Sequence, residues 1–196
     1  MTVWYTARGA GLAAVILLTG ATTLGTLMSG RLPASPSARV VMQYLHRAVA
    51  STALAVLGLH VTMILADSFA HVGVLGALVP LRSGYRPLWV GLGTLATYLV
   101  LLVAATGFLR RRMATSPRTA ALWRSIHLAS YGAWGMAMLH GIKSGTDSGL
   151  PWVRWMYVGC GIAVAGSICA RAIAGPRTVT RPRSVGQPAR HAAVAR

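Results

Sequence analysis

The chain has 196 residues, of which 55% are hydrophobic, and its 19 Lys and Arg against 2 Asp and Glu give a net charge of +17. The charges gather between long apolar runs, which excludes an ordinary soluble domain and favours an integral membrane protein in contact with lipid. The basic excess does not indicate a nucleic-acid partner, because short basic loops beside apolar segments are typical of the cytoplasmic side of membrane proteins.

Five apolar segments are long enough to cross, or nearly cross, a hydrocarbon layer of about 30 Å. Helices are expected at residues 9–30, 40–66, 88–109, 122–142 and 152–170. The fold class is therefore all-α, a five-helix transmembrane bundle over residues 9–170. Residues 1–8 are expected to be a short outer N-terminus. Residues 171–196, rich in Arg and Pro, are expected to form a disordered basic cytoplasmic tail.

The connections between these segments predict the orientation of the chain in the membrane. The N-terminus and the stretches 67–86 and 143–154 share one side, which holds five cations and both acids. The other side holds the remaining fourteen cations. Basic residues concentrate on the cytoplasmic side, so we expect an N-out, C-in, multi-pass protein of the cytoplasmic membrane.

Four of the six histidines lie inside apolar segments: His46 and His60 in the second, and His127 and His140 in the fourth. Ionisable residues at membrane depth are costly and by default mark function, although a lone histidine is more often a hydrogen-bonding residue between helices. The separations of 14 and 13 residues place the second histidine of each helix roughly 20 Å beyond the first. The second and fourth helices run in the same direction, so the histidines are expected to pair by depth.

An inner pair, His46 and His127, and an outer pair, His60 and His140, can each supply both axial ligands of one haem iron. A zinc site fits poorly, because it needs about four ligands around one ion. Fourteen residues return to within about 40° of the starting face of a helix, but thirteen miss it by about 140°. Gly132 and Gly135 lie between His127 and His140 and permit a distortion of the helix.

Three cations flank these histidines: Arg47 and Arg124 near the inner pair, and Lys143 near the outer pair. They are candidates for contacts to haem propionates, and equally for ordinary charges that set the topology. In the outer loop, Asp67 and His71 are four residues apart, which suits either a metal-binding pair or a plain surface pair. His191, in the tail, supports no assignment.

The histidine spacing and its flanking residues resemble the ferric reductase-like transmembrane domain family, in its actinobacterial form. This superfamily includes NADPH oxidases, ferric-chelate reductases and the haem subunit of the bacterial methionine sulfoxide reductase system. The resemblance extends over residues 8–170. It is carried by residues 44–47, 59–60, 79–87, 122–128, 139–141 and 145–147.

The resemblance implies two haem b groups, ligated by His46 with His127 and by His60 with His140, that pass single electrons across the membrane. No Gly-rich dinucleotide motif occurs, and the segment after the fifth helix is too short for flavin and nicotinamide domains. We therefore expect the membrane electron-transfer component of an oxidoreductase. Its electrons would come from quinol or from a separate redox partner protein that supplies a quinone or flavin.

The sequence is compatible with several terminal electron acceptors and with a second function. Ferric iron, oxygen, and an outer protein or flavin domain are all compatible terminal acceptors. The alternative function is a haem-free polytopic membrane protein, such as a transporter or an assembly partner, that uses its intramembrane histidines for proton relay. The 13-residue spacing favours this alternative, whereas the pairing of the histidines by depth and the scarcity of acids within the membrane speak against it.

Overall fold

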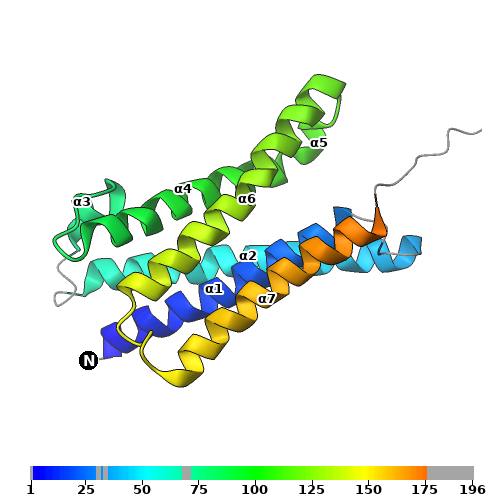
Figure 1. The fold of residues 1–196 in the computed structure, drawn as a ribbon. Coiled ribbons are helices and arrows are strands. Elements are labelled where there is room, and N and C mark those ends of the chain that lie inside the picture. The colour runs from blue at the N-terminus through cyan, green and yellow to red at the C-terminus, as the bar shows by residue number, and fades with distance from the viewer. Residues whose placement is uncertain (1, 30–31, 33–34, 68–71, 176–196) are drawn as a thin grey trace, which may run out of the picture.

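The computed structural model describes residues 2–29, 32, 35–67 and 72–175. These residues form helices and no strands, in agreement with the predicted all-α class (Figure 1). In chain order the helices are α1 (Thr2–Ser29), α2 (Pro36–Ala66), α3 (Gly73–Leu78), α4 (Pro87–Phe108), α5 (Arg110–Met113), α6 (Pro117–Ser144) and α7 (Pro151–Ala174).

Proline and capping residues explain why most of the long helices begin before the apolar runs do. α2, α4, α6 and α7 each carry proline in the first turn, where no backbone N–H is needed. The Ser35 hydroxyl accepts a hydrogen bond from the Ala38 N–H at the start of α2. Ser116 and Thr119 form a reciprocal capping box at the start of α6. α6 therefore begins at Pro117 and includes polar residues that hydropathy alone left out.

Within the described residues, four helices are long and apolar enough to cross a membrane: α1, α2, α4 and α7. They correspond to four of the five predicted spans, which supports a helical membrane protein. α6 has 28 residues, enough for a length of roughly 40 Å, but it is the least apolar of the five long helices. Its lower hydropathy reflects the His, Tyr, Trp and Ser residues along it.

The long helices form two groups that face each other (Figure 1). α1 packs along α2 and also against α7, whereas α4 packs along α6. α1 also touches α6 and so connects the two groups. In the described part of the chain, α2 and α6 share little backbone contact, so the two histidine-bearing helices approach each other through side chains.

The core lies around α1, and small side chains let its neighbours approach closely. Ala7, Ala10, Ala14 and Ala21 of α1 are all buried. A cluster of buried apolar residues joins α1 to α7 and consists of Val15, Val153, Tyr157 and Cys160. This packing holds α1, whose backbone carbonyls bind two of the histidines, in place.

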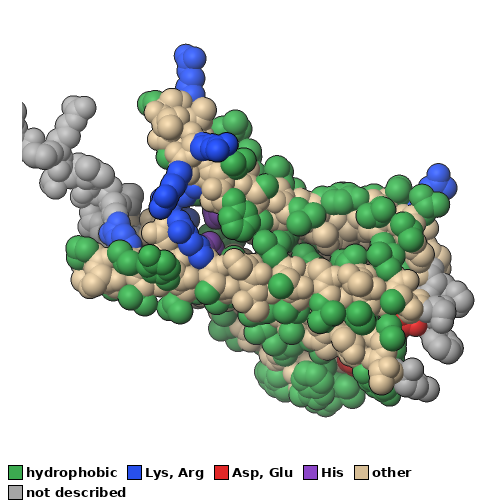
Figure 2. Space-filling view, turned by 180° about the vertical axis from the view of Figure 1, so that it is seen from behind, with side chains coloured by type: hydrophobic (Ala, Val, Ile, Leu, Met, Phe, Trp, Pro, Cys, Tyr) green, Lys and Arg blue, Asp and Glu red, His purple; other side chains and the backbone are tan. Residues whose placement is uncertain are grey.

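Large apolar side chains cover the outer surfaces of the helices (Figure 2). Leu101 of α4 is 52% exposed, Phe108 is 76% exposed and Ile162 of α7 is 67% exposed. Apolar surface of this extent is rare on a monomeric soluble protein and is the normal state of helices that contact lipid.

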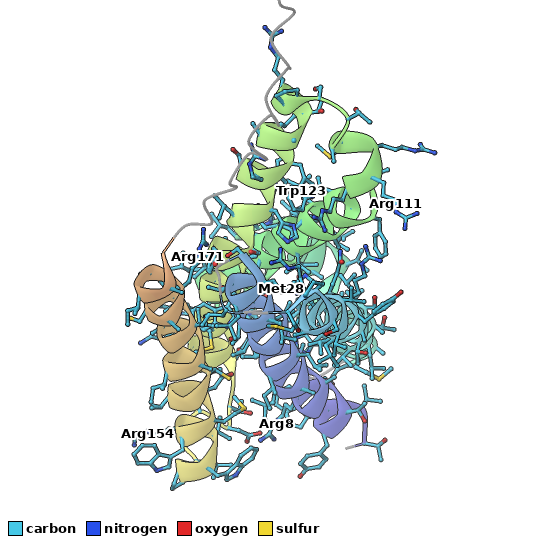
Figure 3. The ribbon with its side chains drawn as sticks, turned by 90° about the vertical axis from the view of Figure 1, so that its right-hand side faces the viewer. Arg8, Met28, Arg111, Trp123, Arg154 and Arg171 are labelled. Atoms are coloured by element: carbon cyan, nitrogen blue, oxygen red, sulfur yellow. The ribbon has the colours of Figure 1, made fainter. Side chains whose placement is uncertain are left out.

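Charged side chains occupy the two ends of the bundle. Figure 3 shows Arg8 and Arg154 at one end and Arg111 and Arg171 at the other. Figure 2 shows that several Lys and Arg side chains gather at one end and that acidic side chains lie toward the opposite end. This grouping matches the one that the loops predict. After the predicted orientation, we name the Arg8 end the outer end and the Arg111 end the inner end.

Candidate functional site

The structure brings the four histidines of α2 and α6 together as the two predicted pairs. The ring centroids of His46 on α2 and His127 on α6 are 6.3 Å apart, and their planes meet at 62°. Those of His60 and His140, from the same two helices, are 6.4 Å apart at 75°. The inner pair and the outer pair thus have nearly the same separation.

This separation agrees with two imidazoles bound to one metal ion. A ligating nitrogen lies about 2 Å from the metal and each ring centre lies about 1.1 Å behind its nitrogen, so the centroids should be roughly 6.3 Å apart. A T-shaped contact between two rings also falls in this distance range. The hydrogen-bond partners of the ring nitrogens show which nitrogen would be available to a metal.

The Nδ1 atoms of three histidines are turned toward backbone carbonyls on a neighbouring helix. His60 Nδ1 lies 2.7 Å from the Ala7 oxygen and His46 Nδ1 lies 2.9 Å from the Ala21 oxygen, both on α1. His140 Nδ1 lies 2.8 Å from the Trp89 oxygen on α4. A carbonyl only accepts, so Nδ1 carries the proton in all three rings. Nε2 therefore keeps the lone pair that binds a metal, the arrangement usual for metal-ligating histidine.

A glycine four residues after each of these carbonyls gives the ring its space. A Cβ on Gly11 would lie 2.9 Å from His60, one on Gly25 would lie 3.3 Å from His46, and one on Gly93 would lie 2.6 Å from His140. We call each combination of a carbonyl and the glycine four residues later a carbonyl seat. The three seats are Ala7/Gly11, Ala21/Gly25 and Trp89/Gly93.

The seats were not predicted from the sequence, although the sequence carries a signal for them. Gly11 and Gly25 are 14 residues apart, as are His46 and His60 on the helix that packs along α1. Matching intervals of glycine and histidine on adjacent helices are what two stacked sites require. Gly93 and Gly107 on α4 repeat the interval.

His127 lies outside this arrangement. Its ring stacks on Trp123, one turn earlier on α6, with centroids 5.1 Å apart and planes at 24°. Among the described residues, neither His127 Nδ1 nor Trp123 Nε1 has a hydrogen-bond partner, and both atoms are buried. The Arg110 guanidinium lies 5.1 Å from the centre of the Trp123 ring.

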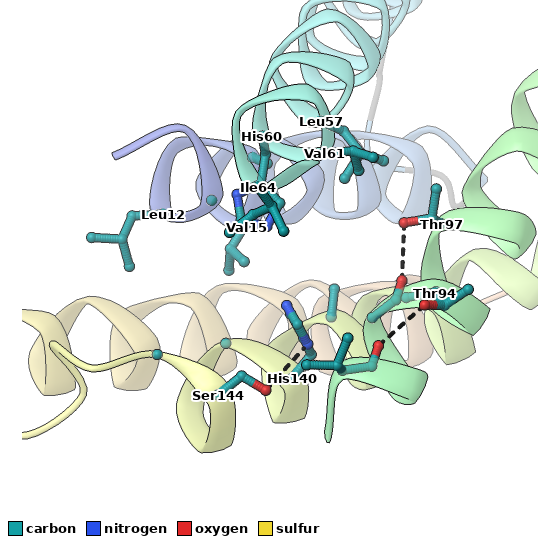
Figure 4. A pocket seen from close by; sticks show the side chains of 18 of the residues that line it. Leu12, Val15, Leu57, His60, Val61, Ile64, Thr94, Thr97, His140 and Ser144 are labelled. Carbon is teal, nitrogen blue, oxygen red and sulfur yellow. Dashed lines mark hydrogen bonds between the residues drawn. The ribbon is translucent and has the colours of Figure 1, made fainter. Parts of the chain in front are cut away.

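A cavity of about 580 Å³ surrounds the outer pair, a volume in the range usual for bound cofactors. His60 and His140 reach into it from opposite sides, as Figure 4 shows. Its wall is mostly apolar, including Leu12, Val15 and Val61. A largely apolar cavity between two histidine rings has the character that a flat, largely apolar prosthetic group such as haem requires.

The cations near the sites differ in part from those predicted. Arg47, Arg124 and Lys143 are exposed, and the Lys143 ammonium lies 5.6 Å from the centre of the Trp89 ring. Arg8 was not singled out from the sequence, yet it lines the cavity of the outer pair and forms an ion pair with Asp147. Its position three residues before Gly11 on α1 is the sequence feature from which a role for Arg8 could have been predicted.

Two hydrogen bonds join α1 to α6 at depths between the histidines of α6. The Trp134 indole N–H donates to the Thr19 hydroxyl at 2.9 Å. The Tyr131 and Thr26 hydroxyls are 2.7 Å apart, and Thr26 is almost fully buried. These contacts hold the two helix groups together at a depth where a polar group needs a partner within the protein.

The remaining candidate residues are not part of these sites. His71 and His191, and the basic tail beyond residue 175, lie outside the described residues, so the pairing of Asp67 with His71 is not tested. The described residues contain no group of three or more His, Cys, Asp or Glu side chains that could hold a metal ion. A haem iron needs only two protein ligands, so pairs are sufficient for it.

Comparisons with protein-family models, with curated proteins and with solved structures found no match to this chain. The functional interpretation therefore depends on the residues and on the geometry of the two histidine pairs.

Proposed function

We propose that this chain is a two-haem b-type membrane cytochrome, the electron-transfer subunit of a ferric reductase-like system. It would carry single electrons across the cytoplasmic membrane between two haems. His46 and His127 would hold the inner haem, and His60 and His140 the outer one. A separate redox partner or quinol would supply the electrons.

One observation supports the proposal: the two histidine pairs have the separation expected of paired axial ligands. In three of the four rings Nδ1 donates to a backbone carbonyl, so Nε2 keeps the lone pair that could bind a metal. Histidines that relay protons need neighbours that donate and accept in turn. A backbone carbonyl fixes one tautomer instead, which suits a metal ligand.

The proposal makes α6 the fifth transmembrane helix, with the N-terminus outside and the C-terminus inside. His127, Tyr131 and Trp134 are spaced i, i+4, i+7 and share one face of α6. Thr26 and Thr19 of α1 bind the last two of these side chains. Polar side chains directed into the bundle lower the mean hydropathy of α6 without placing a polar surface in lipid.

The chain would position the haems rather than perform the chemistry itself. Bound haem iron supplies one-electron reduction and oxidation, with its potential set by the axial ligands and their surroundings. The four histidines would hold the two groups at depths roughly 20 Å apart along the helices, and the mostly apolar wall of the cavity would surround the outer one. Arg8 lines the outer cavity and can hold a propionate there, in addition to the predicted Lys143.

The test is spectroscopic. The full chain, purified in detergent after expression with a haem supply, should show b-type bands in reduced-minus-oxidised spectra and two haems per chain in a pyridine haemochrome assay. A purified, folded protein without b-type bands would contradict the proposal and favour the haem-free alternative.

A further inference from the structure

Three of the four histidines occupy carbonyl seats, and the chain provides a fourth seat that His127 does not use. Val103 and Gly107 lie 14 residues after Trp89 and Gly93, the seat of His140, on the same helix. The Val103 carbonyl accepts the Thr106 hydroxyl at 2.9 Å. Among the described residues, nothing lies within 4 Å of a Cβ placed on Gly107.

The unequal spacing on α6 gives the physical reason. The glycines on α1, the glycines on α4 and the histidines on α2 are all separated by 14 residues, but His127 and His140 are separated by 13. One residue fewer turns His127 by about 100° from the direction in which the fourth seat lies. The ring meets His46 from another flank and stacks on Trp123.

The surroundings of the two pairs differ in the same sense. His60 and His140 lie in a cavity lined mostly by apolar side chains. At the end where Lys and Arg side chains gather, Figure 2 shows histidine side chains visible at the bottom of a hollow. This hollow gives a small molecule a route to histidine side chains from the basic end of the bundle.

We propose that His127 is an exchangeable ligand and that the inner site binds small neutral ligands, such as carbon monoxide, whereas the outer site does not. This inference rests on the proposed haem function. In the exchange, the His127 imidazole would leave the iron with its electron pair and the neutral ligand would donate a pair in its place. No electron would be transferred, so the iron would keep its ferrous state.

The size of the difference follows from the missing second contact. Loss of a hydrogen bond behind a metal-ligating histidine typically weakens metal binding by about 10–100-fold. The outer pair has two such contacts, from Ala7 and Trp89, and the inner pair has one, from Ala21. Transient release of His127 should therefore be about 10–100 times more favourable than release of His140.

The experiment is a carbon monoxide titration of the dithionite-reduced holoprotein, followed by absorption difference spectra. One haem per chain should react, and the other should keep its six-coordinate spectrum. H60A, which leaves the inner haem, should react completely, and H46A, which leaves the outer haem, should not react. Two inert haems or two equally reactive haems would overturn the inference while leaving the proposed function intact. Absence of b-type bands before the addition would remove the proposed function itself.

A matched pair of glycine variants tests the inference without removing a ligand. G93A places a Cβ 2.6 Å from His140 Nδ1, whereas G107A meets open space among the described residues. G93A should raise the number of reactive haems from one to two, and G107A should leave it at one. The same number of reactive haems in G93A, G107A and the parent protein would contradict the role assigned to the seats.

Discussion

The outer and the inner histidine pairs have nearly the same separation but differ in how they are held. Both rings of the outer pair donate to carbonyls of adjacent helices and line a largely apolar cavity. In the inner pair, His46 occupies a carbonyl seat and His127 stacks on Trp123. Two histidine pairs on the same two helices thus have nearly the same separation but different numbers of supporting hydrogen bonds.

The comparison shows that different parts of the chain determine the distance between the paired histidines and the contacts that hold each histidine ring. α2 and α6 carry the four histidines, but α1 and α4 supply the carbonyls and glycines that orient three of them. The second contact fixes the tautomer and restricts the ring, so its loss leaves the distance between the rings intact and lowers the cost of releasing one of them.

The largest expected effect comes from removing a ligand. H60A or H140A should lose the outer haem, and H46A or H127A the inner one, so each variant should retain about half of the haem because the pairs are independent. Haem content per chain from the pyridine haemochrome assay measures this. Retention of both haems in any of the four variants would contradict the assignment of that residue as a ligand.

The next effect concerns the support of the outer pair. G93A should lower the affinity of the outer haem by about 10–100-fold, because the added methyl group forces the His140 ring away from the Trp89 carbonyl. Transfer of haem to an excess of apomyoglobin measures the loss rate. G107A is the matched control and should release haem at the parent rate; equal acceleration in both variants would contradict the role assigned to the Trp89/Gly93 seat.

A smaller effect is expected from Arg8, which lines the cavity of the outer pair. R8Q removes the cation that lines the outer cavity and should weaken outer haem binding by up to about tenfold, the scale of one partly exposed charge-assisted hydrogen bond. D147N frees Arg8 from its ion pair and should not weaken haem binding. Haem loss rates of both variants at low and high salt measure this; faster loss in D147N than in R8Q would exclude Arg8 as a propionate ligand.

The smallest effect concerns the contact between the two helix groups. T19V leaves the Trp134 indole N–H unpartnered and should cost about 1 kcal/mol of stability, which lowers Tm by roughly 2–4 °C. Thr52 bonds only within its own helix, to the Ala48 carbonyl, in the hydrogen bonds described for it, so T52V serves as the control. Thermal unfolding of the haem-loaded protein in detergent compares them, and equal Tm values would argue against a stabilising role for the Thr19–Trp134 contact.

Much of the fold could be predicted from the apolar runs, because a chain that crosses lipid must hydrogen-bond its own backbone N–H and C=O groups, and long helices do so. The helix starts at Pro36 and Pro117 could not be predicted from hydropathy, since capping and proline extend helices beyond the apolar segment. The pairing of His46 with His127 and of His60 with His140 followed from depth alone, since α2 and α6 run in the same direction.

The supporting contacts could not be predicted in the same way. Depth places a histidine along the membrane normal but does not determine which helix it faces, so the seats at Gly11, Gly25 and Gly93 appear only once α1 and α4 are packed. The 13-residue interval before His140 conflicted with ideal helix geometry. In the structure, the His127 ring lies beside the His46 ring and stacks on Trp123, and it does not use the fourth carbonyl seat.

Electron paramagnetic resonance of the oxidised holoprotein tests the central claim most directly. The imidazole planes meet at 62° in the inner pair and 75° in the outer pair, far from coplanar. For low-spin ferric haem with two histidine ligands, strongly inclined planes give a highly anisotropic signal with a large maximum g value. The account predicts two such signals, one lost in H46A and the other in H60A. Purified, folded protein that shows no haem signal, or only high-spin signals that no histidine substitution changes, would contradict it.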